Sequence, residues 1–131
     1  MRVMLDSNVI LSALLFLGET MKELMFKVTT KYKLVLSTYI INEIIDVSHR
    51  KFSDKVTVIE DLLNQLTYEL VSTPEQLDSG LFEIRDVKDY PTLYSAITEQ
   101  VDVFVTGDKD FADVKIEKPE MLTPAEFVGK Y

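Results

Sequence analysis

Residues 3–8 read VMLDSN, an apolar run that passes directly into a carboxylate and two small polar residues. A run this short, followed by helix-like sequence, is typical of a buried strand in a parallel sheet. Asp6 would then lie at the carboxyl end of the strand, which is the edge where open α/β sheets bind their ligands. A simpler interpretation stays open, in which Asp6 or Ser7 only caps the helix that follows.

The bulk composition describes a single domain, residues 1–131, that is large enough to bury its own core. The sequence has no Cys and one His, His49, which excludes a disulfide framework, a zinc–thiolate site and a thiol nucleophile. The formal net charge of −8 argues against binding nucleic acid by bulk electrostatics, but it permits an enzyme that holds a phosphodiester through metal ions. The sequence has neither a signal-peptide pattern nor an apolar run long enough to span a membrane, so we expect a cytoplasmic protein.

Apolar runs and segments with helical periodicity alternate along the chain. The predicted strands and extended segments are residues 3–5, 34–36, 68–71, 101–106 and a last piece from 116. The predicted helices are residues 9–16, a second from 20, 39–51, 54–66, one that follows 89 and a short one after 123. Strands that are separated by helices indicate the α/β class with a central parallel sheet.

Capping residues mark several of these helix starts. Residues 20–23 and 123–126 both have the T-x-x-E form of a capping box. Pro91 fits the first turn of a helix, which makes Asp89 the expected N-cap. Between the regular elements, we expect residues 74–80 to form a true loop.

Several acidic residues fall at the edge of the predicted sheet where the strands end. They are Asp6, Glu43, Asp86, Asp89, Asp108 and Asp110. Asp6 and Asp108 follow two different strands, and Asp89 enters the same edge from the start of a helix. Glu43 borders the buried face of its own helix, because at 3.6 residues per turn it projects only about 60° from Ile40.

Carboxylates that share one cleft need a cation, since like charges about 4 Å apart repel by roughly 1 to 4 kcal/mol per pair. Mg²⁺ and Mn²⁺ are the usual partners, because they prefer carboxylate and water oxygens. One or two such ions support metal-assisted phosphodiester hydrolysis, which needs no nucleophile from the protein. The residues alone therefore predict a Mg²⁺ or Mn²⁺ site and leave its substrate open.

Four segments of the chain resemble the signature regions of PIN-domain proteins, most closely those of the toxin component of toxin–antitoxin systems. The segments are LDSNVILSALL (residues 5–15), STYIINEIIDV (37–47), RDVKDYPTLYSAI (85–97) and VDVFVTGDKDF (101–111). They occur in the order that the family has, and the resemblance extends from Val3 to about Phe127. It implies a three-layer α/β/α sandwich with a central parallel sheet.

The resemblance also implies a Mg²⁺- or Mn²⁺-dependent endoribonuclease. Its catalytic and metal-binding carboxylates fall on Asp6, Glu43, Asp89 and Asp108. Supporting polar contacts fall on Ser7 or Asn8 and on Thr106, and the plausible additional acids are Asp86 and Asp110. Between the third and fourth acids the chain is one residue longer than the family pattern, which leaves the choice between Asp86 and Asp89 open. We prefer Asp89, because its expected cap position directs the carboxylate at the sheet edge.

The partners that the resemblance implies are an RNA substrate, a cognate antitoxin whose segment reaches the acidic site, and a second copy of the chain in a homodimer. Residues 14–17 would supply an apolar contact surface, although we favour their packing against the sheet. The alternative function is a catalytically silent PIN-like module that only binds a protein partner. A phosphoaspartate enzyme of the haloacid-dehalogenase type fits less well, since it needs an aspartate where this chain has Asn8.

Overall fold

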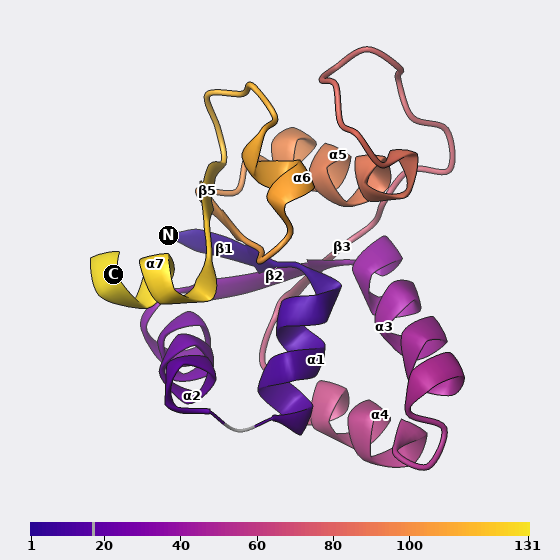
Figure 1. Cartoon of the computed structure of the whole chain (residues 1–131), viewed down its shortest axis with the longest axis vertical. Helices are drawn as coiled ribbons and strands as arrows, with labels where there is room; N and C mark the ends of the chain where they lie inside the picture. The colour runs from indigo at the N-terminus through magenta and orange to yellow at the C-terminus, as the bar shows by residue number, and fades with distance from the viewer. Residues whose placement is uncertain (17) are drawn as a thin grey trace.

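Five parallel strands form the central sheet of the structure, a computed structural model that describes residues 1–16 and 18–131 (Figure 1). The strands are β1 (Arg2–Leu5), β2 (Lys33–Ser37), β3 (Glu69–Val71), β4 (Val103–Val105) and β5 (Glu120–Leu122). Their order across the sheet is β3-β2-β1-β4-β5, and every neighbouring pair is parallel. The predicted α/β class and parallel sheet are confirmed.

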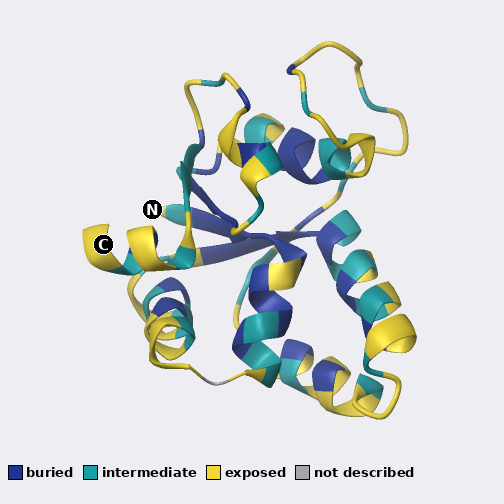
Figure 2. Ribbon diagram, viewed as in Figure 1, coloured by how far each residue is buried: buried dark blue, intermediate teal, exposed yellow. Residues whose placement is uncertain are grey.

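β1 lies at the centre of the sheet and has its two neighbours far away in the sequence. Met4 is in register with Val35 of β2 on one side and with Phe104 of β4 on the other. All three of these side chains are completely buried, and Figure 2 shows the central strands as largely buried. Strands that are covered on both faces need continuous apolar runs, which is why the short runs in the sequence predicted them correctly.

Helices cover both faces of this sheet. They are α1 (Ser7–Leu15), α2 (Glu19–Phe26), the π-helical turn η1 (Lys27–Lys31), α3 (Thr38–Lys51), α4 (Val56–Gln65), the 3-10 turn η2 (Val87–Asp89), α5 (Tyr90–Thr98), α6 (Lys109–Ala112) and α7 (Pro124–Lys130). Figure 1 shows α5 and α6 on one face and α1 to α4 on the opposite face, where α7 packs beside α2. The three-layer α/β/α architecture is therefore confirmed.

One of the two predicted capping boxes forms and the other does not. At the start of α7, the Thr123 hydroxyl accepts a hydrogen bond from the Glu126 N–H at 3.1 Å, and the Glu126 carboxylate accepts one from the Thr123 N–H at 3.0 Å. The box at residues 20–23 was wrong, because α2 already begins at Glu19 with Gly18 as its N-cap. The Gly18 carbonyl accepts the N–H of Lys22 at 3.0 Å, which places the whole T-x-x-E segment inside the helix.

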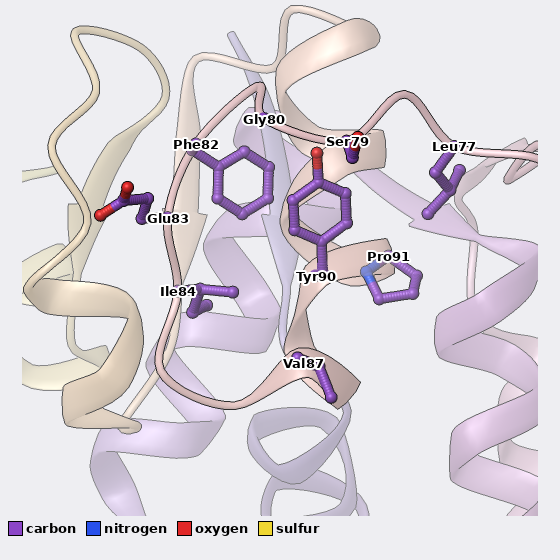
Figure 3. Close-up of a pocket in the computed structure, with 9 residues that line it drawn as sticks. All are labelled: Leu77, Ser79, Gly80, Phe82, Glu83, Ile84, Val87, Tyr90 and Pro91. Atoms are coloured by element: carbon purple, nitrogen blue, oxygen red, sulfur yellow. The ribbon is translucent and has the colours of Figure 1, made fainter.

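An irregular segment, residues 72–86, joins β3 to η2 (Figure 3). The predicted loop is confirmed within it, but the segment continues to Asp86. It is held by α5, since the Tyr90 hydroxyl donates a hydrogen bond to the Asp78 carbonyl at 2.5 Å and accepts one from the Leu81 N–H at 3.3 Å. These contacts link residues that are about ten positions apart, so local sequence patterns do not reveal them.

The end of α1 carries the apolar residues that we considered as a contact surface. Leu14 and Leu15 are partly buried against the core, in line with their expected packing, while the Phe16 side chain is 62 % exposed. Leu17 lies outside the described residues. In the described part of the chain, none of the helices has the length and apolar character that crossing a bilayer requires.

Candidate metal centre

Asp6 lies where β1 ends, at the centre of the sheet edge, and only 6 % of it is exposed. Its Oδ1 atom accepts a hydrogen bond from the Ser7 N–H at 2.8 Å, so Asp6 is the N-cap of α1. Its Oδ2 atom accepts a hydrogen bond from the Thr106 hydroxyl at 2.9 Å. Asp6 therefore caps a helix and also presents a buried carboxylate at the edge of the sheet.

The pKa of Asp6 is raised to about 6, chiefly by burial and to a smaller extent by the negative charges of Glu43 and Asp108. The hydrogen bonds from Thr106 and Ser7 act in the opposite direction but do not compensate for burial. A carboxylate whose ionised form is disfavoured in this way gains stability from a nearby cation. The environment of Asp6 is thus suited to a metal ion.

Thr106 connects the end of β4 to the end of β1. Its hydroxyl donates to Asp6 and accepts a hydrogen bond from the Asp108 N–H at 3.0 Å. The residue is buried, so water does not compete for these bonds. Thr106, at a position where we expected a supporting polar contact, therefore joins the turn that carries Asp108 to the carboxylate of Asp6.

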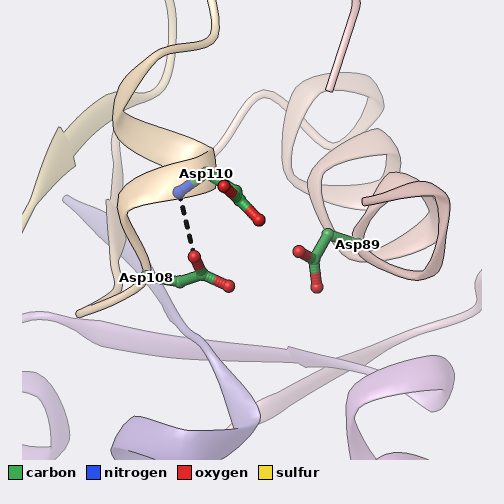
Figure 4. A group of neighbouring side chains, drawn as sticks. All are labelled: Asp89, Asp108 and Asp110. Atoms are coloured by element: carbon green, nitrogen blue, oxygen red, sulfur yellow. Dashed lines mark hydrogen bonds between the residues drawn. The ribbon is translucent and has the colours of Figure 1, made fainter. Parts of the chain in front are cut away.

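Asp89, Asp108 and Asp110 form a group of carboxylates at this edge (Figure 4). One oxygen from each lies within 4.8 Å of the others. Asp108 is the N-cap of α6 and accepts the Asp110 N–H at 2.9 Å, so α6 holds both acids on one side, facing Asp89 of η2. Oxygens that share one Mg²⁺ are roughly 3 to 4 Å apart, given metal–oxygen distances of about 2.1 Å. The oxygens of these acids are thus near the separation that one divalent cation requires, and a small inward movement of the side chains would bring them to it.

The Asp89 carboxylate has one oxygen without a hydrogen-bond partner in the described structure. Among residues 1–16 and 18–131, its Oδ2 atom is buried and has no hydrogen-bond partner. Burial raises the pKa of Asp89 to about 7, with further contributions from the charges of Asp108, Asp86, Asp6 and Glu43. Buried polar atoms are usually paired, so this oxygen is available to a cation or to another hydrogen-bond partner.

Asp89 occupies the predicted N-cap position of α5, with Pro91 in the first turn, but it does not act as a side-chain cap. In the described structure its side chain makes no capping hydrogen bond to α5, since the backbone of Asp89 is already helical as the last residue of η2. Asp86 caps η2 instead, by accepting the Lys88 N–H at 3.0 Å. Asp86 is exposed, whereas Asp89 belongs to the carboxylate group, so the geometry favours Asp89 as the third acid.

Glu43 lies on α3, which follows β2, and reaches the same edge of the sheet. Its Oε1 atom accepts a short hydrogen bond from the hydroxyl of Ser7, which is buried at the start of α1. The charge of Glu43 raises the pKa of both Asp6 and Asp89. All four predicted carboxylates thus converge, but the tight group consists of Asp89 and Asp108 with Asp110, while Asp6 and Glu43 are held beside it by hydroxyl groups.

Two further residues border the centre. Asn8 is exposed and lines a pocket of about 520 Å³ together with Asp6 and Asp108. Tyr39 was not predicted as a site residue; its hydroxyl donates to the Lys88 carbonyl at 2.9 Å, and burial and the Glu43 charge raise its pKa. The spacing of Tyr39 and Glu43, one helical turn apart, was the available signal, because such residues share a helix face.

The family model described as PIN domain matches residues 2–110 of this sequence. The chain belongs to the PIN-domain family. The matched range contains every acid of the candidate metal centre and both hydroxyl residues that support them. The family resemblance noted in the sequence is thereby confirmed, and a carboxylate cluster that can hold a divalent metal lies inside the PIN domain.

The fold is similar to that of a chain in the crystal structure of VapBC2 from Rickettsia felis bound to a DNA fragment from their promoter. The two chains have 18% sequence identity and a TM-score of 0.69. The match covers 93% of this chain and 97% of the other chain, so the whole PIN domain has the same architecture. Among curated proteins, none matches this sequence.

Proposed function

We propose that this PIN-domain protein is a Mg²⁺- or Mn²⁺-dependent endoribonuclease and the toxin of a toxin–antitoxin pair. PIN domains are in general nucleases. The observation that carries the proposal is the buried Oδ2 atom of Asp89, which lies beside Asp108 and Asp110 and lacks a partner within the described residues. An unpaired buried carboxylate oxygen destabilises the fold, and a divalent cation between these acids would remove that penalty.

We assign the catalytic and metal-binding roles to the carboxylates of Asp6, Glu43, Asp89 and Asp108, with Asp110 as a further metal ligand. When bound, Mg²⁺ or Mn²⁺ would activate a water molecule and stabilise the charge of the phosphoryl group. The hydroxyls of Thr106 and Ser7 hold Asp6 and Glu43 in fixed orientations. The Asp6 carboxylate can carry a proton in the metal-free protein near pH 6, which it releases when the cation binds.

The RNA substrate and the protein partner belong to the same proposal. With a net charge of −8, the protein attracts a phosphodiester through the bound cation and not through its overall charge. The similarity of the fold to a chain of VapBC2 supports an antitoxin as the partner. We also propose that the protein forms a homodimer and that it acts in the cytoplasm, where RNA is available.

Cleavage of RNA by the purified protein tests the enzymatic part directly. We expect labelled single-stranded or structured RNA to be cut with Mg²⁺ or Mn²⁺ and to remain intact with EDTA. Asp108→Asn and Asp6→Asn should abolish cleavage while the circular dichroism spectrum stays that of the wild type. Asp61→Asn, at an exposed position of α4, is a matched control and should cleave like the wild type.

A catalytically silent binding module is the competing function, and metal titration separates the two. Isothermal titration calorimetry with Mn²⁺ should detect a site in the wild type that Asp108→Asn loses. If the wild type binds no metal and cuts no RNA, while it still binds its antitoxin, the enzymatic proposal is wrong and the binding module is correct.

A further inference from the structure

A second concave site lies next to the candidate metal centre, between the irregular segment 72–86 and the start of α5 (Figure 3). Its volume is about 610 Å³, which is within the usual range for small-molecule sites. The residues that line it are Leu77, Ser79, Gly80, Phe82, Glu83, Ile84, Val87, Tyr90 and Pro91. Most of these side chains are apolar or aromatic, and the lining, all of which is described, contains no cation.

An ordered aromatic pair forms part of the wall. The rings of Phe82 and Tyr90 stack with their centroids 4.4 Å apart and an interplanar angle of 15°. The Tyr90 hydroxyl is bound on both sides by backbone groups of the irregular segment, which fixes the ring before any ligand enters. A preformed aromatic wall lowers the entropic cost of binding a flat ligand.

One apolar side chain of the lining remains largely open to solvent. Val87 is 79% exposed. An exposed apolar side chain at a pocket is available for contact with a ligand. Because the lining offers Glu83 as its charged group and no cation, the pocket suits an uncharged planar group better than a phosphate.

We propose that this pocket binds a nucleobase of the RNA that is cut at the metal centre. Val87 and Tyr90, which line the pocket, lie two residues before and one residue after Asp89, so the pocket begins where the carboxylate group ends. A nucleotide with its phosphate at the metal centre has its base only one ribose away, so the base would lie near a pocket whose lining includes the chain neighbours of Asp89. Bases stack readily on aromatic side chains, and such stacking sets the preference of many RNA-binding sites.

The inference rests on the proposed ribonuclease function, but its test needs neither a metal nor cleavage. Adenosine, guanosine, cytidine and uridine are titrated separately into the ¹⁵N-labelled protein, with ribose as the control that lacks a base. We expect saturable shifts of the backbone amide signals of Ser79, Gly80 and Val87 with at least one nucleoside and no shifts with ribose. If these shifts are absent in a protein that still cleaves RNA, the proposal that the pocket binds a nucleobase is wrong, and the proposed ribonuclease function is unaffected.

Substitutions in the wall of the pocket measure how much it contributes to nucleoside binding. Tyr90→Leu should weaken nucleoside binding by roughly 5- to 150-fold, the range that removal of one stacking aromatic produces. Tyr90→Phe keeps the ring face and should weaken binding much less. Val87→Asp changes a highly exposed position, so the fold should persist while binding of the nucleoside falls.

A protein segment is the other class of occupant, and the same spectra exclude or reveal it. If no nucleoside shifts the pocket amides but the co-purified antitoxin does, the pocket is a protein-docking site and the nucleobase proposal is wrong. Equal affinities of the wild type, Tyr90→Leu and Val87→Asp for every nucleoside would also overturn it.

Discussion

Replacing Asp6 by Asn should stabilise the metal-free protein at neutral pH. The pKa of Asp6 rises from 3.8 to about 6 in the folded protein, chiefly because the carboxyl is buried. A carboxyl with a raised folded-state pKa costs no stability below its unfolded-state pKa. The penalty grows as the pH rises from about 4 to 6 and is complete above that range. The difference between the two pKa values corresponds to about 3 kcal/mol of unfolding free energy.

Asn retains an oxygen for the Ser7 N–H but removes the acceptor for the Thr106 hydroxyl, which costs about 1 kcal/mol. With EDTA present, the unfolding free energy of Asp6→Asn should therefore be about 2 kcal/mol higher than that of the wild type at pH 8. At pH 4 it should be about 1 kcal/mol lower. The first difference corresponds to a rise in Tm of roughly 5 to 10 °C.

Urea unfolding followed by circular dichroism at pH 4, 6 and 8 measures these differences. Asp61→Asn is the matched control and should leave the pH profile of the wild type unchanged. If the profiles of wild type and Asp6→Asn run parallel from pH 4 to pH 8, then burial does not disfavour the ionised Asp6 and the electrostatic reasoning fails.

Three further predictions address the metal centre and the helix ends. Mn²⁺ should raise the Tm of the wild type more at pH 8 than at pH 5, because the raised pKa values of Asp6 and Asp89 make protons compete with the metal; equal shifts in differential scanning fluorimetry would contradict this. Thr106→Val keeps the shape of the side chain but removes both hydrogen bonds, so cleavage of labelled RNA should fall at least about tenfold, with Thr106→Ser restoring most of it. Thr123→Ala should lower the unfolding free energy by about 1 kcal/mol without affecting cleavage, since it removes only the cap of α7; unchanged urea unfolding would refute that role.

The sheet and its acidic edge were predictable because they depend on short-range patterns. Continuous apolar runs marked β1, β2 and β4; Asp6 follows β1 directly, and Asp108 follows β4 after Thr106 and Gly107. Parallel strands end at one edge, so the convergence of these acids follows from the class of the fold. Glu43 was predictable from its angular position beside Ile40, which is completely buried.

The environment of Asp89 was not predictable in the same way. Its position before Pro91 predicted the N-cap of α5, and Asp89 lies there, but η2 precedes α5 and leaves the Asp89 side chain without a capping hydrogen bond. The geometry of this turn depends on the irregular segment, which Tyr90 fixes through long-range hydrogen bonds. The sequence predicted Asp110 only as an additional acid. Its place in the carboxylate group could not be predicted, because the short helix α6 that turns it toward Asp89 has too few residues to show a periodicity.

The central position of β1 has a consequence for how the protein folds. The Thr106 hydroxyl that holds Asp6 comes from a residue 100 positions later in the chain. During synthesis the N-terminal part of a chain emerges first, so the opening strand has to wait for β4 before its second neighbour can pair. Contacts over such long sequence separations slow folding. We therefore expect shortened chains that end before β4 to lack a formed acidic centre, so that nuclease activity arises only once nearly the whole polypeptide has folded.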